Sequence, residues 1–252
     1  MEVLRMIGNL FIEDQFNQVE QSQMKKYPLL RGCISDGVLY PDLYEKSPLK
    51  MMVLLKEPFD SWDTGTETPV GGDFAFMDVI YNLETHCLEG LNKTWSEIAA
   101  IAFALKNDVA FTENLSYDQI KEGLSCVCFI NLSKTPWRTR TNVNDDSYLE
   151  RVKVWEPIVK AQLQSIDFDI ALYGYTWDSS EINPINPNEQ WDNNKTKDVK
   201  FYNRKTSDNK NLTVQILRYE DSEKIIVNGY HPAYGNSACW QTEYIQDYMK
   251  NN

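Results

Sequence analysis

Four short apolar runs constrain the fold of this 252-residue chain more than any other feature of its sequence. Each run is too short for a helix and ends in a polar or turn-forming cluster, which is typical of a buried strand. The runs occupy residues 51–55, 126–130, 170–173 and 225–227. Their hydrophobicity is continuous rather than alternating, as expected of strands in a parallel sheet that is covered on both faces. We therefore predict a central, mostly parallel, four-stranded sheet.

Helical patterns separate and flank these strands. Capping boxes, in which a hydroxyl and a carboxylate or amide satisfy free N–H groups, begin at Thr94 and Ser116. Apolar residues at three- and four-residue spacing from Tyr148 to Leu163 predict a crossover helix. Helices are predicted over residues 94–106, 116–123 and 148–163, and near 3–23 and 239–250. Alternating strands and helices predict an α/β fold, a three-layer α/β/α sandwich.

The segment between the third and fourth runs differs in composition. Residues 178–198 are rich in Asn, Asp and Pro, and the β-prone segments 199–202 and 212–217 that follow predict a hairpin. We interpret about 178–220 as a polar surface insertion and about 1–48 as an N-terminal helical extension. The whole chain, 1–252, is predicted to be a single domain.

Composition limits the classes of function. No run of about 18 apolar residues exists and the N-terminus lacks a secretory pattern, which predicts a cytoplasmic protein without membrane contact. The five cysteines show no C-x-x-C pair, so we expect buried thiols and neither a metal nor another cofactor. The net charge of −12 opposes an extended nucleic-acid surface. One local basic patch, Lys134, Arg138 and Arg140, is a candidate phosphate contact.

Residues that can take part in catalysis or ligand binding follow the predicted strands. Glu57 follows the first, Asn131 the second, Gly174 and Tyr175 the third, and His231 the fourth. Ligands of open α/β sheets bind beyond the carboxyl ends of the strands, so we expect these side chains to converge on one edge of the sheet.

The order of an acid-Pro-aromatic segment, a strand ending in Asn, a Gly-aromatic turn and a strand ending in His-Pro resembles the uracil-DNA glycosylase superfamily. That family folds as a four-stranded parallel α/β/α sandwich. The resemblance spans roughly residues 51–235. It implies a DNA glycosylase, a hydrolase of DNA repair that releases uracil or a related nucleobase.

The resemblance also implies a role for each matching residue. Glu57 falls where the family places the carboxylate that positions or activates water, and His231 where a histidine stabilises the leaving base. Asn131 matches the residue that reads the base edge. Phe59 falls where an aromatic ring lines the base pocket, and Phe74 or Phe76 is expected to stack on the base.

The loop after His231 is expected to approach DNA and hold the nucleotide out of the stack. Tyr234 is its only bulky residue, where the family has a leucine. Leu55 also stands where the family usually has glycine, and the acid is Glu where several branches have Asp or Asn.

Two alternatives remain open at the level of sequence. The chain is either an N-glycosidic hydrolase or a non-catalytic module of the same fold that binds a nucleobase, a nucleotide or a protein. The acids Glu57, Asp60 and Asp63 are a weaker candidate for a magnesium site, because no second carboxylate cluster completes it.

Overall fold

The computed structural model describes residues 10–58, 62–63, 65–66, 68–71, 83, 93–137, 146–176, 182–205 and 211–251. Its helices are α2 (Leu10–Lys26), α3 (Pro41–Glu45), α5 (Lys93–Asn107), α6 (Tyr117–Ser125), α7 (Asp146–Ser165), the 3₁₀ helix η2 (Asn193–Lys195) and α9 (Ser237–Asn251). Its strands are β1 (Met51–Leu55), β2 (Trp62–Asp63), β3 (Thr68–Pro69), β4 (Val127–Asn131), β5 (Ile170–Gly174), β6 (Thr196–Lys205), β7 (Asn211–Tyr219) and β8 (Ile225–Gly229).

The four predicted strands form a continuous parallel unit. The sheet has the order β4-β1-β5-β8-β7-β6, and the pairs β4–β1, β1–β5 and β5–β8 are all parallel. Met51 to Leu54 of β1 are completely buried, as the uninterrupted apolar run requires. The prediction of an α/β fold with a mostly parallel sheet is therefore confirmed.

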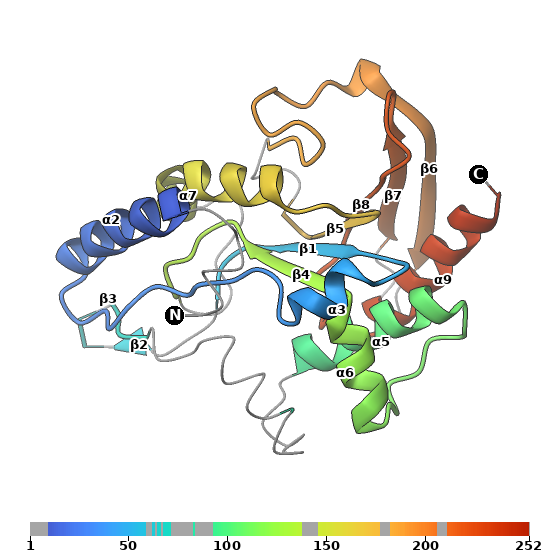
Figure 1. Ribbon diagram of the computed structural model, residues 1–252, viewed down its shortest axis with the longest axis horizontal. Helices are drawn as coiled ribbons and strands as arrows, with labels where there is room; N and C mark the ends of the chain where they lie inside the picture. The colour runs from blue at the N-terminus through green and yellow to red at the C-terminus, as the bar shows by residue number, and fades with distance from the viewer. Residues whose placement is uncertain are drawn as a thin grey trace.

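The sheet has six strands, so the prediction of four strands with a surface hairpin is wrong. β7 pairs antiparallel with β8, and β6 pairs antiparallel with β7, so the hairpin extends the main sheet (Figure 1). The reason lies in β7, where Val214 and Ile216 are fully buried and Leu217 is buried on the opposite face. A surface hairpin would leave these side chains in water, whereas pairing with β8 covers them.

Helices cover both faces of the sheet (Figure 1). On one face, alternate β1 residues Met51 and Val53 join a core with α5, α6 and α9. On the other face, Met52 and Leu54 join a core with α7, against which α2 packs. The predicted capping box at Ser116 is present, because Ser116 N–H donates to the Gln119 side chain and Ser116 Oγ accepts from Gln119 N–H.

A buried ion pair joins the segment before α3 to the segment after β4. Lys134 Nζ lies 2.5 Å from Asp36 Oδ1, and both side chains are fully buried. Asp36 also accepts hydrogen bonds from Gln162 Nε2 at 3.0 Å and Asn131 N–H at 2.6 Å. Lys134 is therefore not part of a surface basic patch, and the expectation that it contacts nucleic acid is wrong. Its charge is neutralised inside the protein instead.

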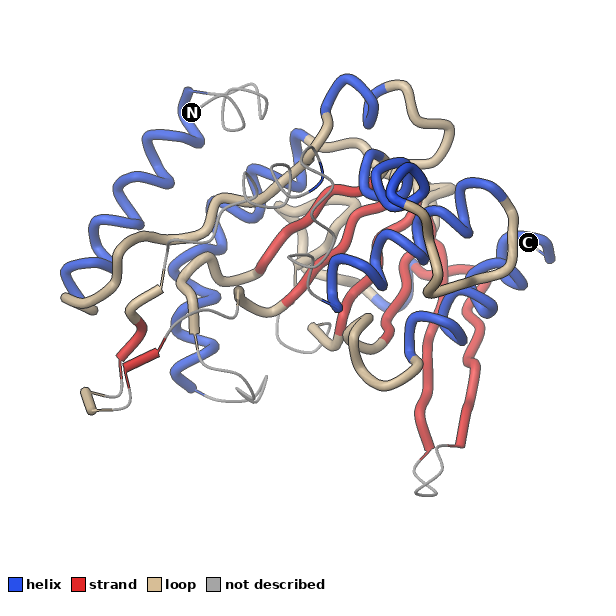
Figure 2. Tube along the Cα trace, turned by 90° about the horizontal axis from the view of Figure 1, so that it is seen from below, coloured by secondary structure: helices blue, strands red, loops and turns tan. Residues whose placement is uncertain are grey.

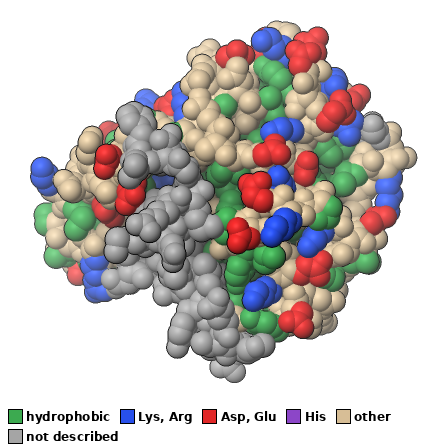
Figure 3. Space-filling view, viewed as in Figure 1, with side chains coloured by type: hydrophobic (Ala, Val, Ile, Leu, Met, Phe, Trp, Pro, Cys, Tyr) green, Lys and Arg blue, Asp and Glu red, His purple; other side chains and the backbone are tan. Residues whose placement is uncertain are grey.

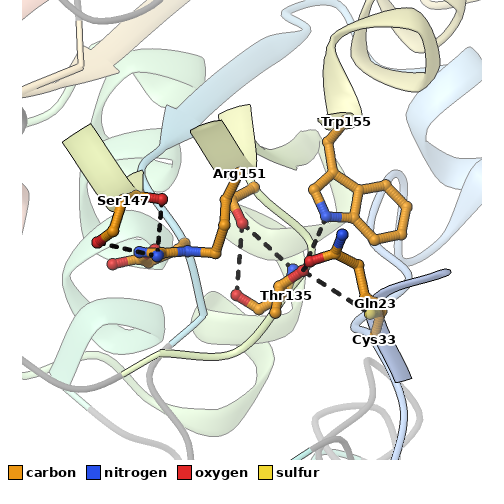
Figure 4. Close-up of polar contacts among 8 residues, drawn as sticks. Gln23, Cys33, Thr135, Ser147, Arg151 and Trp155 are labelled. Atoms are coloured by element: carbon orange, nitrogen blue, oxygen red, sulfur yellow. Dashed lines mark hydrogen bonds and ion pairs between the residues drawn. The ribbon is translucent and has the colours of Figure 1, made fainter. Parts of the chain in front are cut away.

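A second buried polar cluster centres on Thr135 (Figure 4). Its hydroxyl accepts a hydrogen bond from Trp155 Nε1 of α7 at 2.9 Å and donates to Gln23 of α2 at 3.1 Å. Phe16 of α2 packs on the Trp155 ring, with centroids 5.1 Å apart. These contacts attach α2 to the sheet through α7 and the segment after β4. Among the described residues, no helix is long and apolar enough to cross a membrane.

Replacing Asp36 with Ala leaves the Lys134 ammonium buried without a counterion. We expect the free energy of unfolding to fall by about 3–5 kcal/mol, as measured by urea denaturation. The matched control is Lys224→Ala, which removes a cation from a partly exposed pair with Asp167 at 3.1 Å. That change should cost roughly 0–1 kcal/mol. Equal losses in the two variants would show that the buried pair does not organise this part of the fold.

Candidate functional site

Parallel pairing brings the carboxyl ends of four strands to one edge of the sheet. Leu55 of β1 lies opposite Asn131 of β4, and Gly174 of β5 lies opposite Gly229 of β8. Glu57 and His231 follow the ends of β1 and β8 by two residues each. The candidate site residues thus occupy the edge at which open α/β sheets bind ligands.

A cavity of about 500 Å³ opens at this edge. Segments from four strand ends line it: Lys56 after β1, Gly174 and Tyr175 at the end of β5, Leu212 at the start of β7, and Tyr230, His231 and Tyr234 after β8. Four predicted site residues line the cavity, namely Gly174, Tyr175, His231 and Tyr234. Its volume is within the range of small-molecule sites.

Three tyrosine rings form one wall of the cavity. The Tyr175 and Tyr230 rings are stacked with centroids 5.9 Å apart, and the Tyr230 and Tyr234 rings are stacked at 6.1 Å. Trp240 of α9 supports Tyr230 from the side in an edge-on contact at 5.7 Å. Tyr175 and Tyr234 remain about half exposed. Such a wall offers flat apolar faces to a planar aromatic ligand.

Helix α9 fixes the loop that carries His231. The Gln241 side chain accepts from Tyr230 N–H at 2.8 Å and donates to the Tyr230 carbonyl at 3.2 Å. Ser237 Oγ donates to the His231 carbonyl at 2.7 Å. A Cβ at Gly229 would collide with the Gln241 side chain, so this close approach requires glycine.

His231 is neutral at physiological pH and has a defined tautomer. Burial, aided by the nearby Lys56 charge, lowers its pKa from 6.5 to about 4. Its Nδ1 accepts a hydrogen bond from Ala233 N–H at 3.2 Å, so Nδ1 carries no proton. The proton of the neutral ring is therefore on Nε2, which makes Nε2 a hydrogen-bond donor.

The turn after β5 has unusual backbone geometry at Tyr175. This residue adopts φ +63°, a left-handed conformation that is rare for a bulky side chain. Its N–H donates to the carbonyls of Tyr173 and Gly229, both at 3.0 Å, which holds the turn against the end of β8. The strained turn presents the Tyr175 ring beside Tyr230. Strain of this kind is characteristic of functional sites.

Lys56 supplies a positive charge to the cavity lining. Burial lowers the pKa of its ammonium group, and the neighbouring Glu57 carboxylate opposes this shift. Because the charge of Lys56 also disfavours protonation of His231, the two groups are electrostatically coupled.

Glu57 forms a buried ion pair and is not among the residues that line the cavity. Its Oε2 accepts from Arg151 of α7 at 2.8 Å, and the two side chains are 5% and 1% exposed. The Arg151 guanidinium also stacks on the Trp137 ring, 3.6 Å from the centroid, and donates to Ser147 (Figure 4). Arg151 is thus the counterion of the predicted catalytic acid, a contact that the sequence did not reveal.

Asn131 occupies the β4 end of the same edge. Its backbone N–H donates to Asp36, and its half-buried side chain is not among the groups that line the cavity. The edge is therefore divided into a β1–β4 part with Glu57 and Asn131 and a β5–β8 part with the cavity.

Other predicted site residues lie outside the described part of the chain. They are Phe59, Phe74, Phe76, Arg138 and Arg140, and the same holds for Asp60 of the magnesium alternative. Asp63 is described, and its carboxylate accepts from Thr66 N–H at 2.7 Å within a turn. No group of three His, Cys, Asp or Glu side chains in the described residues is arranged to hold a metal ion.

The sequence prediction missed Lys56, Leu212, Tyr230 and Gln241. Lys56 and Tyr230 directly precede predicted site residues, so their position at a strand end was the available signal. Leu212 had no such signal, because its place depends on the pairing of β7 with β8. Neither a family model nor a curated protein matches the sequence.

The protonation state of His231 is directly measurable by nitrogen-detected NMR of ¹⁵N-histidine protein. We expect a midpoint near pH 4 and a neutral ring protonated at Nε2. The unfolded chain takes up this proton at about pH 6.5, so the free energy of unfolding should fall as pH decreases from 6.5 toward 4. His231→Gln assigns the signal. A midpoint near 6.5, or a proton on Nδ1, would contradict this description.

Proposed function

We propose that the cavity binds a nucleobase and that the protein hydrolyses the N-glycosidic bond that attaches this base to a sugar. The tyrosine wall supplies flat faces for a planar ring, and His231 supplies a directed hydrogen-bond donor at the cavity surface. The observation that carries the proposal is the Nε2–H tautomer of a neutral His231 inside an aromatic cavity.

Breaking an N-glycosidic bond leaves its electron pair on the base. Negative charge then develops on a carbonyl oxygen of the departing ring, and a donor placed at that oxygen stabilises the transition state more than the substrate. His231 Nε2–H fits this role as a neutral donor. The Lys56 ammonium, which also lines the cavity, adds favourable electrostatic stabilisation of the anionic base.

In this proposal Glu57 acts on the attacking water. A carboxylate has several lone pairs, so Glu57 can accept a hydrogen bond from water and orient it while Arg151 binds Oε2. Water oxygen then bonds to the sugar carbon as the bond to the base breaks, and a water proton is released. Asn131, at the same end of the sheet, is proposed to read the base edge.

A second candidate is a binding module that recognises a nucleobase without cleaving the bond. The Glu57–Arg151 ion pair favours it, because the buried guanidinium already occupies Oε2 of the carboxylate that would have to bind the water. The burial of Lys134 also removes one cation that was expected to contact DNA. Both candidates use the same cavity and differ only in the water-handling step.

A glycosylase assay separates the two candidates. Oligonucleotides that carry uracil, hypoxanthine or a mismatch, in single- and double-stranded form, are incubated with protein and the abasic sites are cleaved and quantified. We expect His231→Ala to lower the rate of base release by roughly 10²–10³. Glu57→Gln should lower it by about 10²–10⁴.

Phe201→Ala is the matched control, because this ring is exposed and is not part of the cavity lining. It should retain the wild-type rate, and thermal denaturation verifies that each variant is folded. Base release that is equal in wild type, His231→Ala and Glu57→Gln would overturn the catalytic proposal. Base binding without release in folded wild-type protein would favour the binding module.

A further inference from the structure

We propose that the carboxyl end of β6, with Arg204 and Lys205, binds phosphate groups of a nucleic-acid strand whose base enters the cavity. This inference rests on the proposed function and names the substrate class of the same site. It assigns the phosphate contact to a different element from the patch that the sequence suggested.

The first argument is the charge of β6. This strand carries four cations, Lys197, Lys200, Arg204 and Lys205, and one anion, Asp198, in a protein of net charge −12. On the face shown in Figure 3, acidic and basic side chains are interspersed. β6 is thus a basic strand on an acidic protein, and it forms the outer edge of the sheet. A basic stripe of this kind is an electrostatic signature of phosphate binding.

The second argument is that the cations at the two ends of β6 differ in their partners. At the start of the strand, Lys197 pairs with Glu223 at 3.3 Å, and Arg218 of β7 lies between Asp198 and Glu223. At the carboxyl end, Arg204 and Lys205 are both exposed and have no ion pair among the described residues. Among the described residues, the exposed cations of β6 that lack an ion pair therefore lie at the end of the strand.

The third argument is position. β6 runs in the same direction as β8, because each is antiparallel to β7, so its carboxyl end lies toward the edge that bears the cavity. Arg204 is paired with Leu212, which lines the cavity, and paired residues project to the same face of a sheet. Figure 2 shows the hairpin extending past the neighbouring helices.

Two further contacts connect this end of the hairpin to the cavity wall. Thr213 N–H donates to the Tyr230 hydroxyl at 3.4 Å, one residue from Leu212. The charge of Arg204 also acts on Cys239 in the first turn of α9, where it opposes burial and the Glu243 carboxylate, which both raise the pKa of this thiol. Arg204 therefore lies near the helix that fixes the His231 loop.

The chemistry of the two side chains suits a phosphodiester backbone. Arginine binds phosphate oxygens through two parallel N–H donors, and lysine contributes a point charge. A base that leaves the stack to enter the cavity keeps its phosphates outside, where an exposed edge strand can reach them. Because β6 is basic, pairing with the same strand of a second copy would be repulsive.

Fluorescence anisotropy with a labelled single-stranded oligonucleotide of normal bases tests the inference without requiring base release. Arg204→Gln with Lys205→Gln should raise Kd about tenfold or more at low salt. The plot of the logarithm of the association constant against the logarithm of salt concentration should become less steep by about 1.4, which is roughly 0.7 for each lost phosphate contact. The matched control, Lys195→Gln with Lys197→Gln, removes the same charge from paired lysines in η2 and at the start of β6. It should change Kd less than about twofold.

Equal weakening by the two double variants would overturn the inference, because net charge alone would then explain binding. Equal affinity for a mononucleotide and the oligonucleotide would exclude a strand as the ligand. Tighter binding of an acidic peptide that depends on Arg204 and Lys205 would assign the edge to a protein partner. Oligonucleotide binding that depends on Arg204 and Lys205 in wild-type protein that releases no base would contradict only the proposed function.

Discussion

Hydrogen bonding between β1 and its two parallel neighbours determines where the candidate functional side chains lie. β1 pairs with β4 on one side and β5 on the other, and four of its five residues are completely buried. A shift of one residue would exchange Met51 and Val53 with Met52 and Leu54 between the two cores. Because both faces are filled, the register is fixed, and the strand ends meet at one edge.

This edge combines two environments. On the β1–β4 side, Glu57 is held by Arg151 in a buried ion pair, whereas on the β5–β8 side tyrosine rings line the same cavity as a neutral His231. Lys56 connects the two, since it lies beside Glu57 in the chain and lines the cavity with His231. Separation of an anionic, water-orienting group from an apolar, base-binding wall is what the proposed hydrolysis requires.

The sequence predicted local structure better than long-range pairing. Uninterrupted apolar runs identified the four parallel strands, because burial on both faces leaves a local signature. The buried ion pairs of Lys134 and Glu57 could not be predicted from a local pattern, since their partners Asp36 and Arg151 are 98 and 94 residues away in the chain. The hairpin was recognised, but its pairing with β8 depends on tertiary packing of Val214 and Ile216. Tyr175 and His231 could be predicted to line the edge because each lies within two residues of a strand end.

Chemical-shift mapping with a free nucleobase tests the central claim most directly. Uracil or hypoxanthine is titrated into protein labelled at tyrosine and histidine, and the ring signals are followed. The account predicts saturable shifts of Tyr175, Tyr230 and Tyr234 together with the His231 Nε2–H signal, while the distant Tyr219 ring, which packs on Trp191, stays unchanged. No saturable shift with any base, or shifts confined to tyrosines outside the cavity, would contradict it.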